Sequence, residues 1–123
     1  MELHKGGIIP LEQFAAMPKD RDILVRLIVK KTPCKILYSS VRNQRTDFPV
    51  LDCAVYCMNG QYRASIGARP ARATVVCSDR EEDFAAFVAE NVPTESNLRG
   101  SAAYRTHLIR VLVKRCMLEL GGI

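Results

Sequence analysis

Hydrophobic and polar residues alternate along the first half of the chain. Over residues 22–30, four aliphatic side chains share one face, and charged residues lie on the other: Ile23, Val25, Leu27 and Val29. This alternation predicts a half-buried strand. A second strand is predicted over "CKILYSSV", after Thr32-Pro33, and another over "ARATVVCS". Pro10 suits the first turn of a short helix over "LEQFAAM".

The clearest pattern is the hairpin in "LDCAVYCMNGQYRASIGA". Asn59-Gly60 is typical of a two-residue type I′ turn, because both central positions need a positive φ. The register of such a turn can be read from the sequence. Beside the turn, this register pairs Met58 with Gln61. Apolar pairs then share one face: Cys57 with Tyr62, Val55 with Ala64, and Cys53 with Ile66. The more polar pairs lie on the other face: Tyr56 with Arg63, and Ala54 with Ser65.

Two helices are predicted after the strands. Ser78 and Glu81 form a capping-box pattern, and Phe84, Phe87 and Val88 form the expected inward face of the first helix. Ser101 is the expected cap of the second helix. The second helix carries two adjacent apolar stripes: Tyr104, Leu108, Val111 and Leu112, and beside them Ile109, Val113, Cys116, Met117 and Leu120. Such a helix must be covered on more than one side.

The order of elements predicts an α+β fold. We expect an antiparallel meander of four to five strands with two C-terminal helices packed on one face. The length of 123 residues and the 48% hydrophobic composition suit a domain with its own core. No apolar run reaches the roughly 20 residues of a membrane span, and the first residues lack the apolar region of about 7–15 residues of a signal peptide. A soluble, cytoplasmic protein is therefore expected.

Charge and cysteine content limit the kinds of site and partner that the chain is expected to have. The five cysteines are odd in number and match no Cys-x-x-Cys spacing, so buried free thiols are favoured over disulfides, with a metal site as the alternative. The net charge of +5 permits an acidic or nucleic-acid partner, although the arginines are dispersed along the chain. His4 and His107 are the two histidines, and their positions predict no nucleophile–base pair. From the residues alone, the chain is a compact module without an active site of its own.

A family resemblance rests on several segments in order. "SNLRGSAAYRTHLIRVLVKRCM" closely resembles the end of the flavoprotein subunit of molybdenum hydroxylases, which include xanthine and carbon monoxide dehydrogenases. "GGIIPLEQFAAMPKDRDILVRLIVKK" resembles the family's Ile-Pro-Leu-x-x-Phe segment and the strand that leaves the FAD-binding domain. "DFPVLDCAVYCMNGQYRASIGARPARATVV" resembles its hairpin and the Gly-Ala-x-Pro-x-Arg-Ala strand pair. Together these segments cover roughly residues 7–120.

The resemblance implies a fold like the C-terminal domain of the carbon monoxide dehydrogenase flavoprotein over residues 21–123. Residues 1–20 are then a lead-in from a missing FAD-binding domain. FAD belongs to the full-length subunit, because the family's glycine-rich pyrophosphate loops are absent here. Molybdopterin and [2Fe-2S] clusters belong to partner subunits. The isolated domain, which could form a homodimer, is expected to be inactive alone and to help close the FAD site during electron transfer.

Two positions are carried over as cofactor-binding residues. Leu24 matches a family position whose apolar side chain approaches the isoalloxazine ring. Ser39 falls where many members have a lysine that reaches the flavin, so this sequence departs from the family there. The resemblance implies no catalytic residue and no metal ligand in this chain. The alternative is a free-standing α+β binding or dimerisation module with a basic surface, including a surface for nucleic acid.

Overall fold

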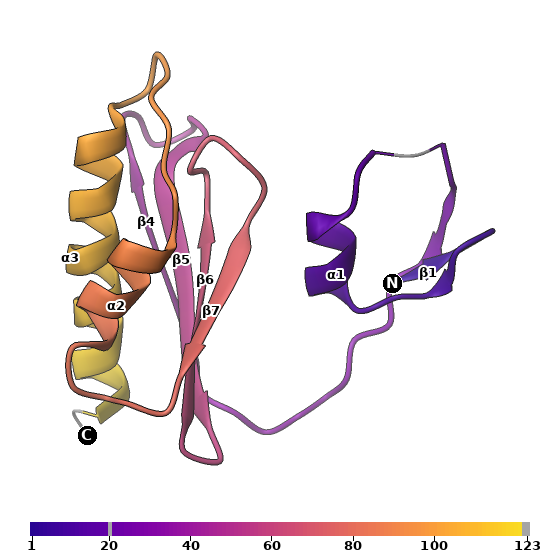
Figure 1. Cartoon of the computed structure of the whole chain (residues 1–123), viewed down its shortest axis with the longest axis horizontal. Helices are drawn as coiled ribbons and strands as arrows, with labels where there is room; N and C mark the ends of the chain where they lie inside the picture. Colours follow the sequence, from indigo (N-terminus) through magenta and orange to yellow (C-terminus); the bar gives the residue numbers. More distant parts are fainter. Residues whose placement is uncertain (20, 122–123) are drawn as a thin grey trace. The chain divides into compact units, whose positions relative to one another are not determined.

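The structure is a computed structural model that describes residues 1–19 and 21–121. It consists of two compact units, Met1–Pro33 and Cys34–Ile123 (Figure 1). The boundary lies later than the one expected from the sequence, which placed residues 21–33 in the second domain. These residues join the first unit because strand β3, Leu24–Arg26, pairs with strand β1, Glu2–Leu3.

The first unit is small and mostly exposed. Its sheet has the order β2-β1-β3, where β2 is Gly7–Ile8, and helix α1 spans Leu11–Ala16 as predicted. The long half-buried strand expected over residues 22–30 was wrong, since β3 has three residues and all are exposed. The reason is that β1, its partner, is itself only two residues long. The aliphatic residues beyond this short ladder stay in solvent, and Val29 is 83% exposed.

The second unit contains the main sheet. Its strands are β4, Ile36–Arg42; β5, Pro49–Met58; β6, Gln61–Gly67; and β7, Thr74–Ser78. They lie in the order β4-β5-β6-β7, each antiparallel to the next. The predicted meander is therefore confirmed. The predicted hairpin register is also confirmed at every pair, from Met58–Gln61 to Cys53–Ile66. Asn59 and Gly60 have φ values of 54° and 75°, as a type I′ turn requires.

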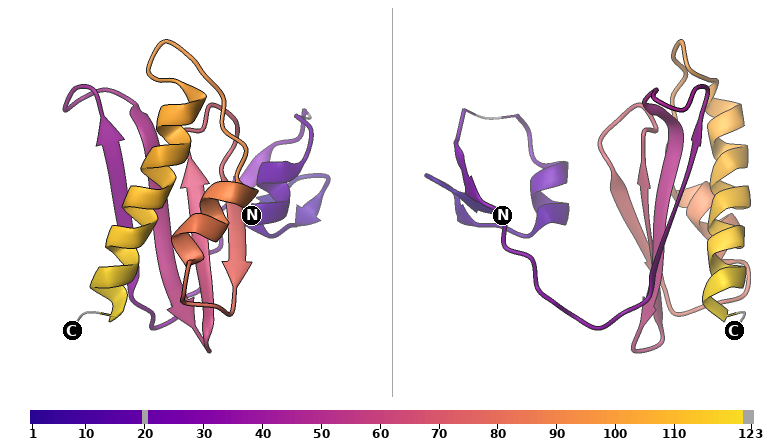
Figure 2. Two further views of the ribbon diagram at one scale, coloured as in Figure 1. Left: turned by 60° about the vertical axis from the view of Figure 1, so that its left-hand side comes forward. Right: turned by 180° about the vertical axis from the view of Figure 1, so that it is seen from behind.

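Helices α2, Phe84–Asn91, and α3, Ala102–Gly121, cover one face of this sheet (Figure 2). The capping box at Ser78 was wrong: Ser78 ends β7, its hydroxyl accepts from the Arg80 N–H at 3.1 Å, and α2 begins later, at Phe84. Phe87 is 40% exposed rather than inward. Ser101 caps α3 as predicted, because its hydroxyl accepts from the Tyr104 N–H at 3.2 Å.

The core lies between this sheet and the two helices. Its fully buried members come from both layers: Leu51, Cys53, Val55, Ala64 and Ile66 from the sheet, and Phe84, Val88, Ile109, Leu112 and Val113 from the helices. The predicted α+β class with its C-terminal helices is thus confirmed. Among the described residues, no helix is long and apolar enough to span a bilayer.

Candidate functional site

Side-chain alternation gives the main sheet two different faces. Leu37 and Val41 of β4 pack against the core, so the residues between them point to the other side. Ten residues on that side form a surface that we call the open face: Ile36, Tyr38, Ser40, Asp52, Ala54, Tyr56, Arg63, Ser65, Val75 and Cys77. The strand register aligns them in rows, and one row runs Tyr38–Ala54–Ser65–Val75 across all four strands.

The open face carries exposed apolar side chains. Within the second unit, neither α2 nor α3 covers it (Figure 2). Ile36 is 56% exposed, Tyr38 is 61% exposed and Val75 is 38% exposed. Exposed apolar side chains on a sheet face that no helix of the same unit covers are typical of a site that packs against another protein part. This arrangement suits a surface that binds a partner by burying its apolar side chains.

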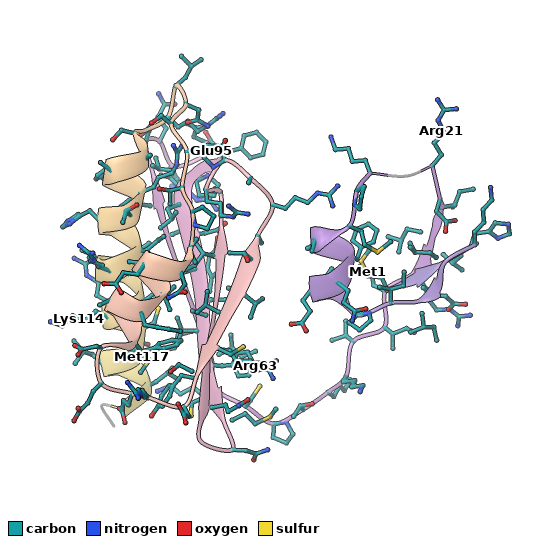
Figure 3. All side chains as sticks on the ribbon, viewed as in Figure 1. Met1, Arg21, Arg63, Glu95, Lys114 and Met117 are labelled. Carbon is teal, nitrogen blue, oxygen red and sulfur yellow. The ribbon has the colours of Figure 1, made fainter. Side chains whose placement is uncertain are left out.

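The two charged groups on the open face lie apart along the sheet, Arg63 toward the Asn59-Gly60 hairpin and Asp52 toward the other end. Arg63 projects on the side away from α3, as Figure 3 shows. Asp52 lies opposite Gly67, and its side chain occupies the space that a Cβ at Gly67 would need. Glycine at this position therefore lets the Asp52 carboxylate lie flat across β6. These groups give the apolar rows a cation and an anion at fixed positions.

One end of the sheet is held together by a buried arginine. Arg105, on the first turn of α3, is 1% exposed. Its Nε donates to the Val50 carbonyl at 2.9 Å, and its Nη1 donates to the carbonyls of Glu95 at 2.7 Å and Gly100 at 2.5 Å. Its Nη2 donates to Oδ1 of Asn97 at 2.6 Å. All four acceptors are neutral, so the guanidinium ties β5, the loop and the helix together through hydrogen bonds alone.

A shallow pocket of about 400 Å³ lies beside this arginine. It brings together the two segments of the second unit that carry the family resemblance, although they are far apart in the chain. The lining residues come from both segments: Phe48, Pro49, Asp52, Ala68 and Pro70 from the first, and Asn97, Arg99 and Arg105 from the second. Two of the segments that resemble the family therefore meet at one end of the sheet.

Arg99 forms the outer wall of the same pocket. Its guanidinium lies 3.4 Å from the Asp47 carboxylate and 5.4 Å from the centre of the Phe48 ring. The amide of Asn43 donates to the Arg99 carbonyl at 3.3 Å. Arg99 is 39% exposed, so water screens this ion pair. It is a polar rim contact, whereas Arg105 is a buried anchor.

The two sequence-predicted site residues lie in different units, and the structure does not bring them together. Leu24 pairs with Leu3 in the first unit and is 46% exposed. Ser39 pairs with Cys53 in β4 and β5. It follows the alternation of its neighbours and lies on the helix-covered side, half-buried, while Tyr38 lies on the open face. The proposed flavin contacts of Leu24 and Ser39 stay predictions.

Sequence reasoning missed Arg105, although a signal was available. The residue precedes Leu108, Ile109 and Leu112 by three, four and seven positions, which is the spacing of one helix face. All three of those residues are buried. The periodicity thus places Arg105 on the inward face, and a buried arginine needs several hydrogen-bond acceptors. Arginine is almost never fully buried unless it is paired, so its charge alone favours a solvent position.

The histidine of α3 and the side-chain types that can bind a metal ion are the candidates for acid–base and metal chemistry in the described part of the chain. His107 is exposed on α3. No group of three or more histidine, cysteine or acidic side chains among residues 1–19 and 21–121 could hold a metal ion. What the described residues offer is a binding surface and a pocket at one end of the sheet.

Comparisons with known proteins add one structural relative. No protein-family model and no curated protein sequence matches the chain. The fold is similar to that of quinoline 2-oxidoreductase from Pseudomonas putida 86, with a TM-score of 0.55 and 20% sequence identity. The likeness covers 72% of this chain and 37% of that one. The chain therefore spans well under half the length of its structural relative, and the two share a fold.

Proposed function

We propose that this chain is the C-terminal domain of the FAD-binding subunit of a molybdopterin-dependent oxidoreductase. In this role it helps to close the FAD site and docks against the rest of the complex. One agreement carries the proposal. The sequence segments resemble the flavoprotein subunit of molybdenum hydroxylases, and the structural relative, found by fold alone, is an oxidoreductase of the molybdenum hydroxylase type.

The described residues do not fit the pyrophosphate of FAD. Helix N-termini are the usual sites for phosphate groups, but α2 is preceded by Glu81, Glu82 and Asp83. At the start of α3, the N–H of Ala102 donates to Ser96 and that of Tyr104 donates to Ser101. The phosphates therefore need another part of the subunit. The proposed contribution of this chain is a wall and a docking surface.

The open face is the proposed docking surface. Its exposed isoleucine, tyrosine and valine side chains would be buried against the FAD-binding part of the subunit, with Arg63 and Asp52 as the polar contacts. The apolar rows supply the driving force, since burial of apolar surface contributes about 25 cal/mol per Å². The charged pair would set the orientation, because unpaired charges are costly in a closed interface.

A domain exchange tests this role. The C-terminal domain of a molybdenum hydroxylase FAD subunit is replaced by this chain, and the flavin retained after gel filtration is measured by absorbance. We expect retention to exceed that of the truncated subunit. The double variant I36E/Y38E should abolish the gain, whereas K114E, on the exposed side of α3, should keep it. Equal retention in I36E/Y38E and K114E would contradict docking through the open face.

A simpler measurement tests the cofactor expectation. The isolated chain should show no bound flavin after purification and no saturable FAD fluorescence quenching. Stoichiometric flavin in the purified chain would contradict the claim that the cofactor needs the other domain. Salt-sensitive binding of nucleic acid would instead favour the alternative of a free-standing basic module.

A further inference from the structure

Two cysteines face each other across the core of the second unit. Cys53 lies in the middle of β5, and Cys116 lies in the C-terminal half of α3. Their sulfur atoms are 4.0 Å apart, and the residues are 0% and 3% exposed. Sixty-three positions of sequence separate them. The fold thus brings two distant thiols into direct contact in a closed environment.

The two sulfur atoms are in contact at 4.0 Å but lie further apart than in a disulfide. A disulfide has a sulfur–sulfur distance of about 2.0 Å, so the two atoms must approach by roughly 2 Å. Rotation of two cysteine side chains supplies movement of this size. Helix α3 packs directly on β5, and Cys53 and Cys116 belong to the same buried cluster as Ile109, Leu112 and Val113.

We propose that Cys53 and Cys116 form a latent cross-linking site, at which a small disulfide oxidant joins β5 covalently to α3. In the first step, one thiolate attacks the oxidant and forms a mixed disulfide, releasing one thiol. In the second step, the other cysteine attacks the mixed disulfide, forms the Cys53–Cys116 bond and releases a second thiol. The two cysteines lose two electrons and two protons, which the two released thiols carry away.

Burial sets the conditions under which the site reacts. Loss of solvent raises the pKa of Cys53 to about 12, with a further contribution from the neighbouring Cys116, and burial also raises the pKa of Cys116. The thiolate is the reactive species, so both groups are inert while α3 is seated. Reaction proceeds through brief openings of the helix. The cross-link should form slowly, and faster when mild urea increases those openings.

The cross-link would close a ring that contains β6, β7 and α2. Closing a long loop restricts the unfolded chain more than the folded one, which raises stability. The open face lies on the other side of the sheet and is unaffected. The site therefore acts on the stability of the helix layer and is independent of the proposed docking role.

Peptide mapping tests the inference. The chain is incubated with oxidised glutathione, the remaining thiols are alkylated in denaturant, and a digest is analysed without reduction. We expect one linked peptide pair containing Cys53 and Cys116, which dithiothreitol removes. The variant C34S/C77S, which lacks the two exposed thiols, should give the same pair, and C116S should not. The urea midpoint of the oxidised chain should be roughly 1–2 M above that of the reduced chain.

The opposite results are equally clear. Complete alkylation of Cys53 and Cys116 in C34S/C77S after oxidation, while its folded state is retained by circular dichroism, would overturn the proposal. Linkage of either cysteine to Cys57 instead would do the same. A cross-linked chain with a lower urea midpoint than the reduced chain would show that the core does not accommodate the bond.

Discussion

Replacing Arg105 with methionine should weaken the second unit more than replacing any other arginine of the pocket. Methionine keeps most of the aliphatic stem, so the change removes the guanidinium and leaves little cavity. Four acceptors each lose one donor: the carbonyls of Val50, Glu95 and Gly100, and the amide oxygen of Asn97. The Gly100 carbonyl keeps the Asn97 N–H, and the Asn97 oxygen keeps the Arg99 N–H. Each acceptor belongs to a loop or strand that the arginine holds.

The size of the stability loss depends on how well water can hydrate each acceptor once the guanidinium is removed. The bond to Val50 is fully buried, and an unsatisfied buried acceptor costs about 1–3 kcal/mol. The other three bonds are part-buried, so their acceptors recover some hydration, and about 0.5–1 kcal/mol each is lost. The free energy of unfolding should fall by about 2.5–6 kcal/mol. With a urea slope near 2 kcal/mol per M, the midpoint falls by about 2 M.

Urea denaturation followed by far-UV circular dichroism measures this change. The matched control is R99M, because Arg99 lines the same pocket but is 39% exposed with a 3.4 Å ion pair, and such pairs contribute about 0–1 kcal/mol. A second variant tests the opposite change, a gain in stability when one acceptor of Arg105 becomes charged. N97D places a carboxylate beside a guanidinium that has only neutral acceptors, and should raise stability by about 1 kcal/mol.

The pH dependence of N97D can be worked out in advance. The guanidinium lowers the pKa of the introduced carboxyl below its unfolded value of about 3.9. The added stability is therefore present at neutral pH and is lost as the pH falls through the lowered folded value. Equal midpoints for R105M and R99M, or a lower midpoint for N97D than for the native chain at pH 7, would refute the reasoning.

Three further predictions concern other parts of the fold. In the first unit, the Asp22 carboxylate accepts hydrogen bonds from the N–H groups of residues 5, 6 and 23. Burial raises the pKa of this carboxyl, but the hydrogen bonds outweigh it, so the pKa lies below 3.8. The NMR shifts of those amides should therefore change on acidification below pH 3.8, and D22N should abolish the change. G67A should cost about 1–2 kcal/mol by overpacking, and D52A/G67A should recover most of it in the same urea assay, an outcome that fails if Asp52 is not the obstacle. I109A should cost about 2–5 kcal/mol as a core truncation, whereas L118A, at a position 66% exposed, should stay within about 0.5 kcal/mol; similar midpoints would contradict the assigned face of α3.

The sequence was most informative where local chemistry and hydrophobic pattern agreed. Asn59-Gly60 dictates its own turn, and that turn fixes the register of every pair along β5 and β6. Ser101 likewise marks the start of α3. These features depend on neighbours in the chain, so they can be predicted without knowledge of the tertiary structure.

Predictions that depended on a distant partner were less successful. The alternation over residues 22–30 is that of a strand, but the length of a strand is set by the strand beside it, and β1 is short. The acidic run after Ser78 favours a helix start, yet α2 begins after Asp83, which has a positive φ of 59°. The open face could not be foreseen either, because alternation alone does not reveal which side the helices will cover.

The order of elements along the chain has a consequence for synthesis. All four strands of the main sheet precede α3, and α3 supplies Ile109, Leu112, Val113 and Cys116 to the core. A nascent chain that has completed the meander therefore still exposes Leu51 and Val55 to solvent until this last helix leaves the ribosome. Exposed strands with apolar faces are prone to aggregate. The growing polypeptide thus passes through a period in which a chaperone that shields β5 would improve the yield of folded protein.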